Sequence, residues 1–304
     1  MNKLQMTLFA ALGVVTVWFI VTWTRLARRT QIVDVPPADR HTLFHAVVAF
    51  VFTFFDALGV GNFAPTTSAF KFRGSVPDEQ IPGTLNVGYA IPTIAQAYIS
   101  IALVKVDPTT LTLMIAAAVI GAWLGAGVVA HWPRRRIQLG MGGALLAAAV
   151  LMLMKQFKVG PVGDEVLALD GMRLGVGLAT IFCLGGLMTL GIGLYAPCLI
   201  LVNLLGMNET TAYPIMMGSC AFLMPVGGMQ FIREGSYHLQ TALVMTLCGL
   251  PASIIALTLF SKLPMVYVRW LVIVAVSYAA TMMLRSAWNE RQPTASSSGD
   301  RVDD

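Results

Sequence analysis

Apolar stretches long enough to cross a lipid bilayer recur along almost the whole chain, and they constrain its fold more than any other feature. A transmembrane helix needs about 20 consecutive, mostly apolar residues. Only 12% of the 304 residues are charged, whereas soluble domains carry about a quarter. The sequence therefore predicts an all-α polytopic membrane protein, a single transmembrane domain over residues 1–304. The predicted segments are 6–26, 42–72, 82–104, 108–130, 137–155, 173–205, 209–232, 238–260 and 264–286.

Two of these segments are longer than one span and are interrupted by almost the same motif. Residues 57–65 read ALGVGNFAP, and residues 189–197, which lie 132 positions later, read TLGIGLYAP. In each half, three further apolar segments follow the motif. This self-similarity indicates an internal duplication. We expect a leading transmembrane helix at 6–26, four-segment repeats at 42–155 and 173–286, and a disordered tail at 287–304.

Arginine clusters predict how the chain crosses the membrane. Basic residues favour the cytoplasmic side, and they cluster at 25–40 and at 134–136. Both clusters are cytoplasmic only if an even number of crossings separates them, so segment 42–72 must enter and return as a broken, re-entrant helix. Treating 173–205 in the same way places the N-terminus outside and the C-terminus in the cytoplasm. The two repeats then begin on opposite faces of the membrane and are inverted.

The net charge of +5 comes from these same arginines at the ends of spans. The positive-inside rule accounts for it, so no nucleic-acid partner is expected. The leading apolar stretch ends in TRLARR and has no small-residue cleavage site. We therefore expect an uncleaved span that stays in the lipid bilayer.

The two motifs have the composition of a broken helix with a binding site at the break. Glycine adopts the tight backbone conformations that a break needs, and proline is favoured at the first position of a helix, so Pro65 and Pro197 each predict the start of a short second helix. The N–H groups and the dipole at a helix start bind anions, and inverted repeats bring two such starts to the membrane midplane. Alternatively, these residues only kink helices for close packing. Polar side chains lie beside both breaks: Thr66, Thr67 and Ser68 in the first half, and Tyr195, Cys198 and Asn203 in the second.

Asp56 stands directly before the first motif, inside an apolar run. An acid at membrane depth is costly and usually functional. It is a candidate for proton coupling, for bracing the broken backbone, or for pairing with Lys71 or Arg73. Its counterpart in the second repeat is Met188, so the acid does not belong to the shared scaffold.

A few other polar residues fall within predicted spans. Asn86, Tyr89 and Gln96 follow each other on roughly one helix face, which favours either a cavity lining or hydrogen bonds between helices. His41, His131 and His238 lie at span ends and are expected at the interface, and His45 gives no further signal.

The paired motifs, the leading span and the two four-segment halves resemble the sulfite exporter TauE/SafE family of bacterial membrane transporters over residues 42–286. The resemblance implies a permease of the cell inner membrane that moves sulfite, a sulfonate or another small organosulfur anion. It assigns the substrate path to Gly59, Gly61, Asn62, Pro65, Thr66, Gly191, Gly193, Tyr195 and Pro197.

Other classes of function find less support in the sequence. A membrane thiol-redox carrier would use Cys198, but the matching residue of the first repeat is Thr66. An anion channel is a further alternative. No HExxH, GxSxG or Walker-type motif is present, so we expect neither an enzyme nor an ATP-driven pump. The four cysteines lack metal-ligand spacing, and no metal or cofactor is expected.

Overall fold

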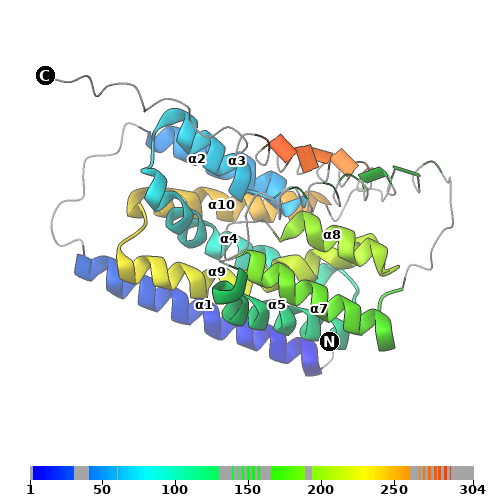
Figure 1. Ribbon diagram of the computed structural model, residues 1–304. Helices are drawn as coiled ribbons and strands as arrows, with labels where there is room; N and C mark the ends of the chain where they lie inside the picture. Colours follow the sequence, from blue (N-terminus) through cyan, green and yellow to red (C-terminus); the bar gives the residue numbers. More distant parts are fainter. Residues whose placement is uncertain are drawn as a thin grey trace, which may run out of the picture.

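The computed structural model describes residues 3–30, 41–59, 61–129, 166–188 and 194–260, with isolated positions between 139 and 157 and between 267 and 288. These residues are helical and, apart from an isolated bridge between Val166 and Met207, contain no β structure. Figure 1 shows the long helices running in roughly one direction. They are α1 (Lys3–Thr30), α2 (Thr42–Ala57), α3 (Phe63–Arg73), α4 (Ile81–Leu103), α5 (Pro108–Val129), α7 (Gly171–Met188), α8 (Tyr195–Leu204), α9 (Ala212–Glu234) and α10 (Leu239–Phe260).

The helices occur in the same order in the two halves of the chain. In the first half α2 is followed by the short α3, a 3₁₀ turn at Asp78–Gln80, and the long helices α4 and α5. In the second half α7 is followed by the short α8, a 3₁₀ turn at Glu209–Thr211, and the long helices α9 and α10. Both predicted broken segments are therefore two helices each.

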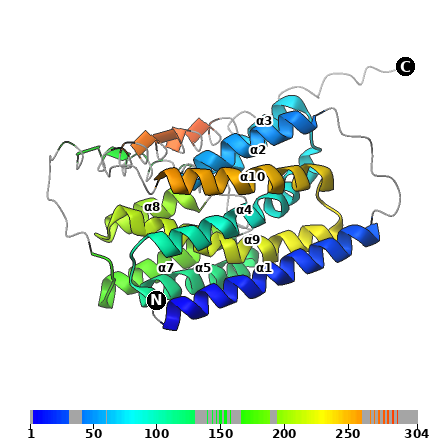
Figure 2. The ribbon, with the colours of Figure 1, turned by 180° about the vertical axis from the view of Figure 1, so that it is seen from behind.

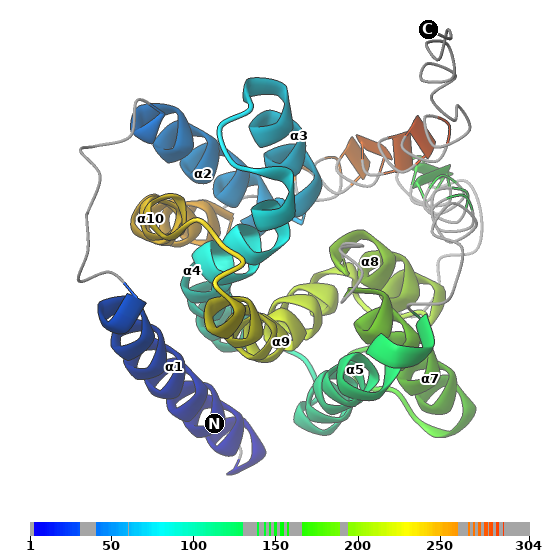
Figure 3. The ribbon, with the colours of Figure 1, turned by 60° about the vertical axis from the view of Figure 1, so that its left-hand side comes forward.

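The two halves are held together by contacts between helices of one half and helices of the other. Helices α4 and α9 lie against each other at the centre, α5 packs on α7, and α10 packs on α2. Figure 3, which looks nearly along the bundle, shows α10 beside α2 and α5 beside α7. The leading helix α1 lies outside this bundle, against α9 (Figure 2). Each half therefore completes the helix packing of the other.

Four of the described helices are long and apolar enough to cross a membrane: α1, α7, α9 and α10. The apolar parts of α2 and α5 are shorter. Helix α4 has 23 residues but is less apolar, and its polar side chains Thr84, Thr93 and Gln96 are buried against other helices. The described helices therefore fit a multi-pass membrane protein. The predicted spans 137–155 and 264–286 lie mostly outside the described residues.

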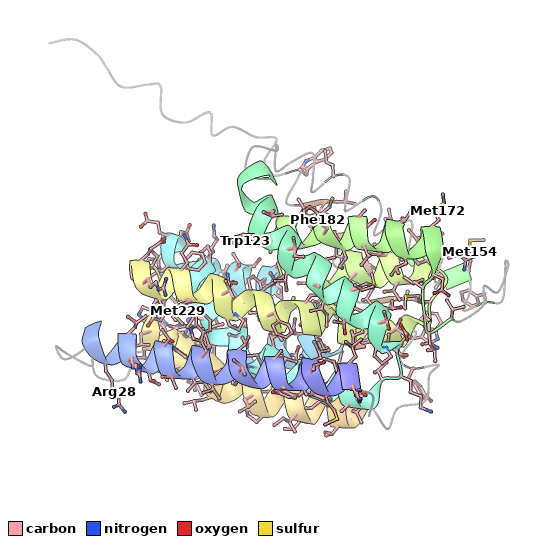
Figure 4. The ribbon with its side chains drawn as sticks, turned by 90° about the horizontal axis from the view of Figure 1, so that it is seen from below. Arg28, Trp123, Met154, Met172, Phe182 and Met229 are labelled. Carbon is pink, nitrogen blue, oxygen red and sulfur yellow. The ribbon has the colours of Figure 1, made fainter. Side chains whose placement is uncertain are left out.

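The outer surface of the bundle carries large apolar side chains. Trp123 on α5 is 80% exposed and Met172 on α7 is 86% exposed (Figure 4). Exposed large apolar side chains of this kind are unfavourable in water and suit contact with lipid.

The α5–α7 crossing depends on two glycines. A Cβ on Gly121 would overlap the carbonyl group of Phe182, the residue labelled where these helices meet in Figure 4. A Cβ on Gly185 would overlap the carbonyl group of Ala118. Small residues let membrane helices approach backbone to backbone, and this crossing fixes how the second half sits on the first.

Candidate functional site

The first break is a short non-helical connection between α2 and α3. Helix α2 ends at Ala57, and Gly59 and Gly61 follow with φ angles of +97° and +81°. These angles lie in the left-handed region, which glycine adopts without steric cost. The predicted role of the motif glycines in breaking the helix is confirmed for these two positions.

The short helices begin two residues earlier than the prolines predict. Helix α3 starts at Phe63 and α8 starts at Tyr195, so Pro65 and Pro197 each occupy the third helical position. The prediction of a proline at the first position is wrong. The physical reason for a proline is unchanged, because the N–H groups of the whole first turn lack a partner within the helix.

Asp56 lies at the end of α2 and is 2% exposed. Its Oδ2 accepts a hydrogen bond from Nε2 of Gln96, on α4, at 3.0 Å. The backbone N–H of Asn62, at the start of α3, is a further donor to the carboxyl group. The acid therefore holds together the end of α2, the start of α3 and the middle of α4.

The second half of the chain completes this polar cluster. The hydroxyl of Tyr195, the first residue of α8, donates to Oε1 of Gln96 at 3.2 Å. Nε2 of Gln96 also donates to Oγ of Ser253, on α10, at 3.3 Å. The Gln96 amide therefore uses its carbonyl oxygen and its amino group at once, and it connects Asp56 in the first half with Tyr195 in the second.

Two more buried hydrogen bonds fix the first break. Thr66 Oγ1 and the Tyr89 hydroxyl, on α3 and α4, are 2.8 Å apart. The Tyr213 hydroxyl on α9 donates to the carbonyl oxygen of Leu58 at 3.1 Å, so a helix of the second half supports the break of the first. Of the polar face predicted on α4, Tyr89 and Gln96 bond to other helices, whereas Asn86 bonds to Pro82 on its own helix.

The cationic partners considered for Asp56 lie elsewhere. Lys71 forms an exposed ion pair with Asp78, with Nζ 3.4 Å from Oδ2. The guanidinium of Arg73 lies over the ring of Phe44, 4.9 Å from its centroid. Pairing of Asp56 with either residue is therefore wrong. Lys71 and Arg73 lie in the last turn of α3, at the opposite end of that helix from the break. Asp56 is instead held by neutral donors.

Of the predicted residues, Asp56 and Tyr195, one from each half, bond directly to Gln96, and the others differ in exposure. Gly191 and Gly193 lie outside the described residues. Thr67 is half-buried on α3, and so are Gly61 and Pro65. The buried members of the predicted set are Gly59, Asn62, Thr66, Tyr195, Pro197 and Cys198.

Ser253 is the member of this cluster that the sequence prediction missed. It lies 157 residues from Gln96 along the chain, inside an apolar helix, where a single serine carries no periodic signal. Within the described ranges, no group of three His, Cys, Asp or Glu residues is placed to hold a metal ion. All four cysteines are free, and Cys198 is fully buried.

A cavity of about 350 Å³ lies at the C-terminal end of α4, and its lining includes no residue of either break. Gln5, Lys105 and Asp107 contribute polar groups to its lining, with Ile101 and Leu167 beside them. Gln5 and Asp107 already have partners, because Gln5 donates to the carbonyl oxygen of Ile101 and Asp107 bonds to Thr110. The cavity is therefore separate from the Asp56–Gln96 cluster.

Helices with an apolar surface, two broken segments and a buried polar cluster between them define an integral membrane protein of the transporter type. A comparison with protein-family models assigns the chain more closely. The chain belongs to the sulfite exporter TauE/SafE family, whose model matches residues 2–156, from α1 through the first half. This family consists of membrane transporters of sulfur-containing anions. No curated protein and no solved structure matches the chain.

Proposed function

We propose that the protein is a secondary transporter of a small sulfur-containing anion, such as sulfite or a sulfonate, and that the anion binds between the starts of α3 and α8 near the membrane midplane. The observation that supports this most is the chain of hydrogen bonds from Asp56 through Gln96 to Tyr195. It joins the two helix breaks, one from each half, at a single buried point. The anion crosses unchanged, and the protein acts as a permease without enzymatic activity.

Asp56 supplies coupling to protons in this proposal. Its carboxyl group accepts a hydrogen bond from the N–H of Asn62, at the helix start where an anion is favoured. An ionised Asp56 is therefore an internal anion that competes with the substrate for the same backbone donors. Protonation removes the repulsion and releases the donors, so one proton binds with each anion.

The contacts between helices of the two halves support the hypothesis that the two repeats are inverted. A twofold relation that swaps α2 with α7 and α5 with α10 also swaps the α5–α7 contact with the α2–α10 contact, and both contacts are present. We infer two inverted repeats that open with re-entrant helices, in the inner membrane of a bacterial cell. The N-terminus is outside and the C-terminus is cytoplasmic, because the arginine-rich end of α1 then faces the cytoplasm.

Uptake into proteoliposomes tests the proposal. Purified protein is reconstituted, and entry of radiolabelled sulfite and of a radiolabelled sulfonate is measured with and without an imposed proton gradient. The gradient is expected to stimulate uptake of at least one of the two anions in the wild type. Stimulation is expected to vanish in Asp56→Asn and to persist in Glu79→Gln, because Glu79 is an exposed acid that belongs to neither break.

Two results would contradict the proposal. No uptake of either anion by the folded wild type would remove the assigned substrate class. Unchanged uptake after substitution of both Pro65 and Pro197 by alanine would remove the two short helix starts as the binding site.

A further inference from the structure

A second buried polar cluster lies where α2 and α10 begin, about three turns of α2 away from Asp56. Its members are His45 on α2, which is 1% exposed, Thr241 on α10, which is fully buried, and His238, which directly precedes α10 and is half-buried. Thr241 Oγ1 lies 2.7 Å from Nδ1 of His238 and 3.2 Å from Nδ1 of His45. One hydroxyl therefore stands between two imidazoles that come from opposite halves of the chain.

The backbone fixes where the protons lie in this cluster. The backbone N–H of Thr241 donates to Nδ1 of His238 at 3.3 Å, so this nitrogen carries a lone pair and not a proton. The Thr241 hydroxyl has a single proton, and it donates that proton to the same lone pair at the shorter distance. The hydroxyl oxygen is then an acceptor, so the hydrogen bond to His45 requires a proton on Nδ1 of His45. Neutral His45 is the Nδ1–H tautomer and neutral His238 is the Nε2–H tautomer.

His238 also acts as the N-cap of α10. Thr241 is the third residue of that helix, and a side-chain acceptor bonded to the third N–H is the usual capping arrangement. The backbone N–H of His238 donates in turn to Thr84 Oγ1 on α4 at 2.9 Å. Hydrogen bonds to Thr241 and to Thr84 therefore fix the position of His238, and with it the direction in which the Thr241 hydroxyl donates its proton.

The surroundings of His45 are aromatic and carry few other titratable groups. The ring of Phe70 on α3 meets the imidazole edge-on with centroids 5.2 Å apart, and Phe44 lies 5.9 Å away. The imidazole of His41, the residue directly before α2, has its centroid 6.2 Å from that of His45. The guanidinium of Arg73 lies over the ring of Phe44, 4.9 Å from its centroid. Thr241 on α10 and Thr84 on α4 contribute hydroxyls to this cluster, together with the imidazole of His238.

We propose that His45, Thr241 and His238 form a proton relay between the α2–α10 interface and the face of the bundle where both helices begin. A proton that binds Nε2 of His45 makes this ring an imidazolium. Its Nδ1 proton passes to Thr241 Oγ, and the hydroxyl proton passes to Nδ1 of His238, which then releases its Nε2 proton. One proton enters, one leaves, and only N–H and O–H bonds change.

The relay deepens the proposed function and rests on it for its role in transport. His45 and Asp56 lie on the same buried face of α2, so the relay connects the face that carries the coupling acid with the start of α10. During relay the Nδ1 of His238 is protonated and cannot accept from the Thr241 N–H. The first turn of α10 therefore loses its cap in that state, and proton passage acts on the helix that also supplies Ser253.

Imidazole ¹⁵N NMR tests the relay without any transport assay. The ring nitrogens of the full-length protein are labelled in lipid nanodiscs, and His45 and His238 are assigned from single His→Gln variants. At neutral pH the wild type is expected to show His45 protonated on Nδ1 and His238 protonated on Nε2. Thr241→Val is expected to abolish the Nδ1–H signal of His45, whereas Thr241→Ser keeps it. Thr258→Val is the matched control, because Thr258 is exposed on the same helix.

The wild-type spectrum alone can overturn the relay, whether or not Thr241→Val folds. If neutral His45 carries its proton on Nε2, the relay is wrong. It is equally wrong if Thr241→Val leaves the tautomers of both histidines unchanged. If the spectra are as expected but uptake in proteoliposomes ignores a proton gradient, the relay stands and the coupling proposed for Asp56 fails.

Discussion

Gln96 Nε2 donates a hydrogen bond to Asp56 Oδ2 across 3.0 Å, which ties the centre of α4 to the end of the broken helix. The same amide accepts a hydrogen bond from Tyr195, so the two halves share one side chain at their breaks. A shared side chain makes the two short helices mechanically dependent on each other. Any rearrangement that opens one break has to release Gln96 from the other.

Replacement of Gln96 by methionine keeps the side-chain length and removes every polar contact. Asp56, Tyr195 and Ser253 then lose a buried partner, and leaving a buried polar group unsatisfied costs about 1–3 kcal/mol. We expect a lower free energy of unfolding in denaturant titration and the loss of anion uptake. Asn86→Ala is the control, since Asn86 bonds only to a carbonyl group of its own helix. Equal stability of the two variants would contradict a structural role for Gln96.

The breaks were predictable because their chemistry is local. Gly59 and Gly61 adopt the left-handed backbone that only glycine tolerates easily, and the duplication of their motif marks the site twice. The exact helix start was not predictable from proline. Proline is compatible with any position of the first turn, and the turn after Gly61 decides that α3 begins at Phe63.

The partners of Asp56 could not be predicted, because they depend on packing between distant segments. Gln96 lies 40 residues away, and Ser253 is a further 157 residues beyond Gln96. Nothing in an apolar helix indicates which neighbour a single serine will meet. The first two cations after Asp56 in the sequence, Lys71 and Arg73, were misleading, because α3 carries them along its length to the protein surface.

Gly61→Ala isolates the strain at the first break. An added Cβ at Gly61 meets no atom within 4 Å, so only the φ angle of +81° opposes it. The left-handed conformation costs a non-glycine residue roughly 1–2 kcal/mol, and we expect unfolding to become easier by that amount. Gly175→Ala is the control, because this helical glycine also faces open space at an ordinary φ angle. Gly175→Ala is expected to raise the free energy of unfolding by about 0.5–1 kcal/mol. If both substitutions change the free energy of unfolding in the same direction, the backbone at Gly61 does not oppose an alanine as its φ angle predicts.

The contribution of the hydrogen bond between Thr66 and Tyr89 to stability can be measured with a double-mutant cycle. Thr66→Val and Tyr89→Phe each leave one buried hydroxyl without its partner, at a cost of about 1–3 kcal/mol. The double variant removes both groups, so its loss is expected to be smaller than the sum of the two single losses by about 0.5–3 kcal/mol. Denaturant titration of the four proteins gives this difference. Strict additivity would show that the 2.8 Å contact contributes nothing.

Gly121→Ala tests the α5–α7 crossing that joins the two halves. The new Cβ would overlap the backbone carbonyl group of Phe182, which cannot turn aside as a flexible side chain does. Overpacking of this kind costs about 1–3 kcal/mol, and we expect α5 and α7 to separate. A cysteine pair placed across the crossing and joined by a short crosslinker reports the separation as a lower crosslinking yield. An unchanged yield would mean that the glycine is not needed for the approach.

Folding stability is expected to fall at alkaline pH because of Tyr237, which lies between α9 and α10. Trp23 Nε1 on α1 donates to the Tyr237 hydroxyl between α9 and α10 at 3.3 Å, and partial burial raises the pKa of Tyr237 above its ordinary value of 10.0. Below that value Tyr237 is neutral in both states, and its contribution is complete. Above it the unfolded chain ionises first, so stability falls as the pH rises. Tyr237→Phe lacks this pH dependence and loses about 1 kcal/mol at neutral pH with the indole hydrogen bond. Thermal unfolding from about pH 8 to about pH 11 checks both effects, and parallel curves for wild type and variant would show that Tyr237 does not titrate as its burial requires.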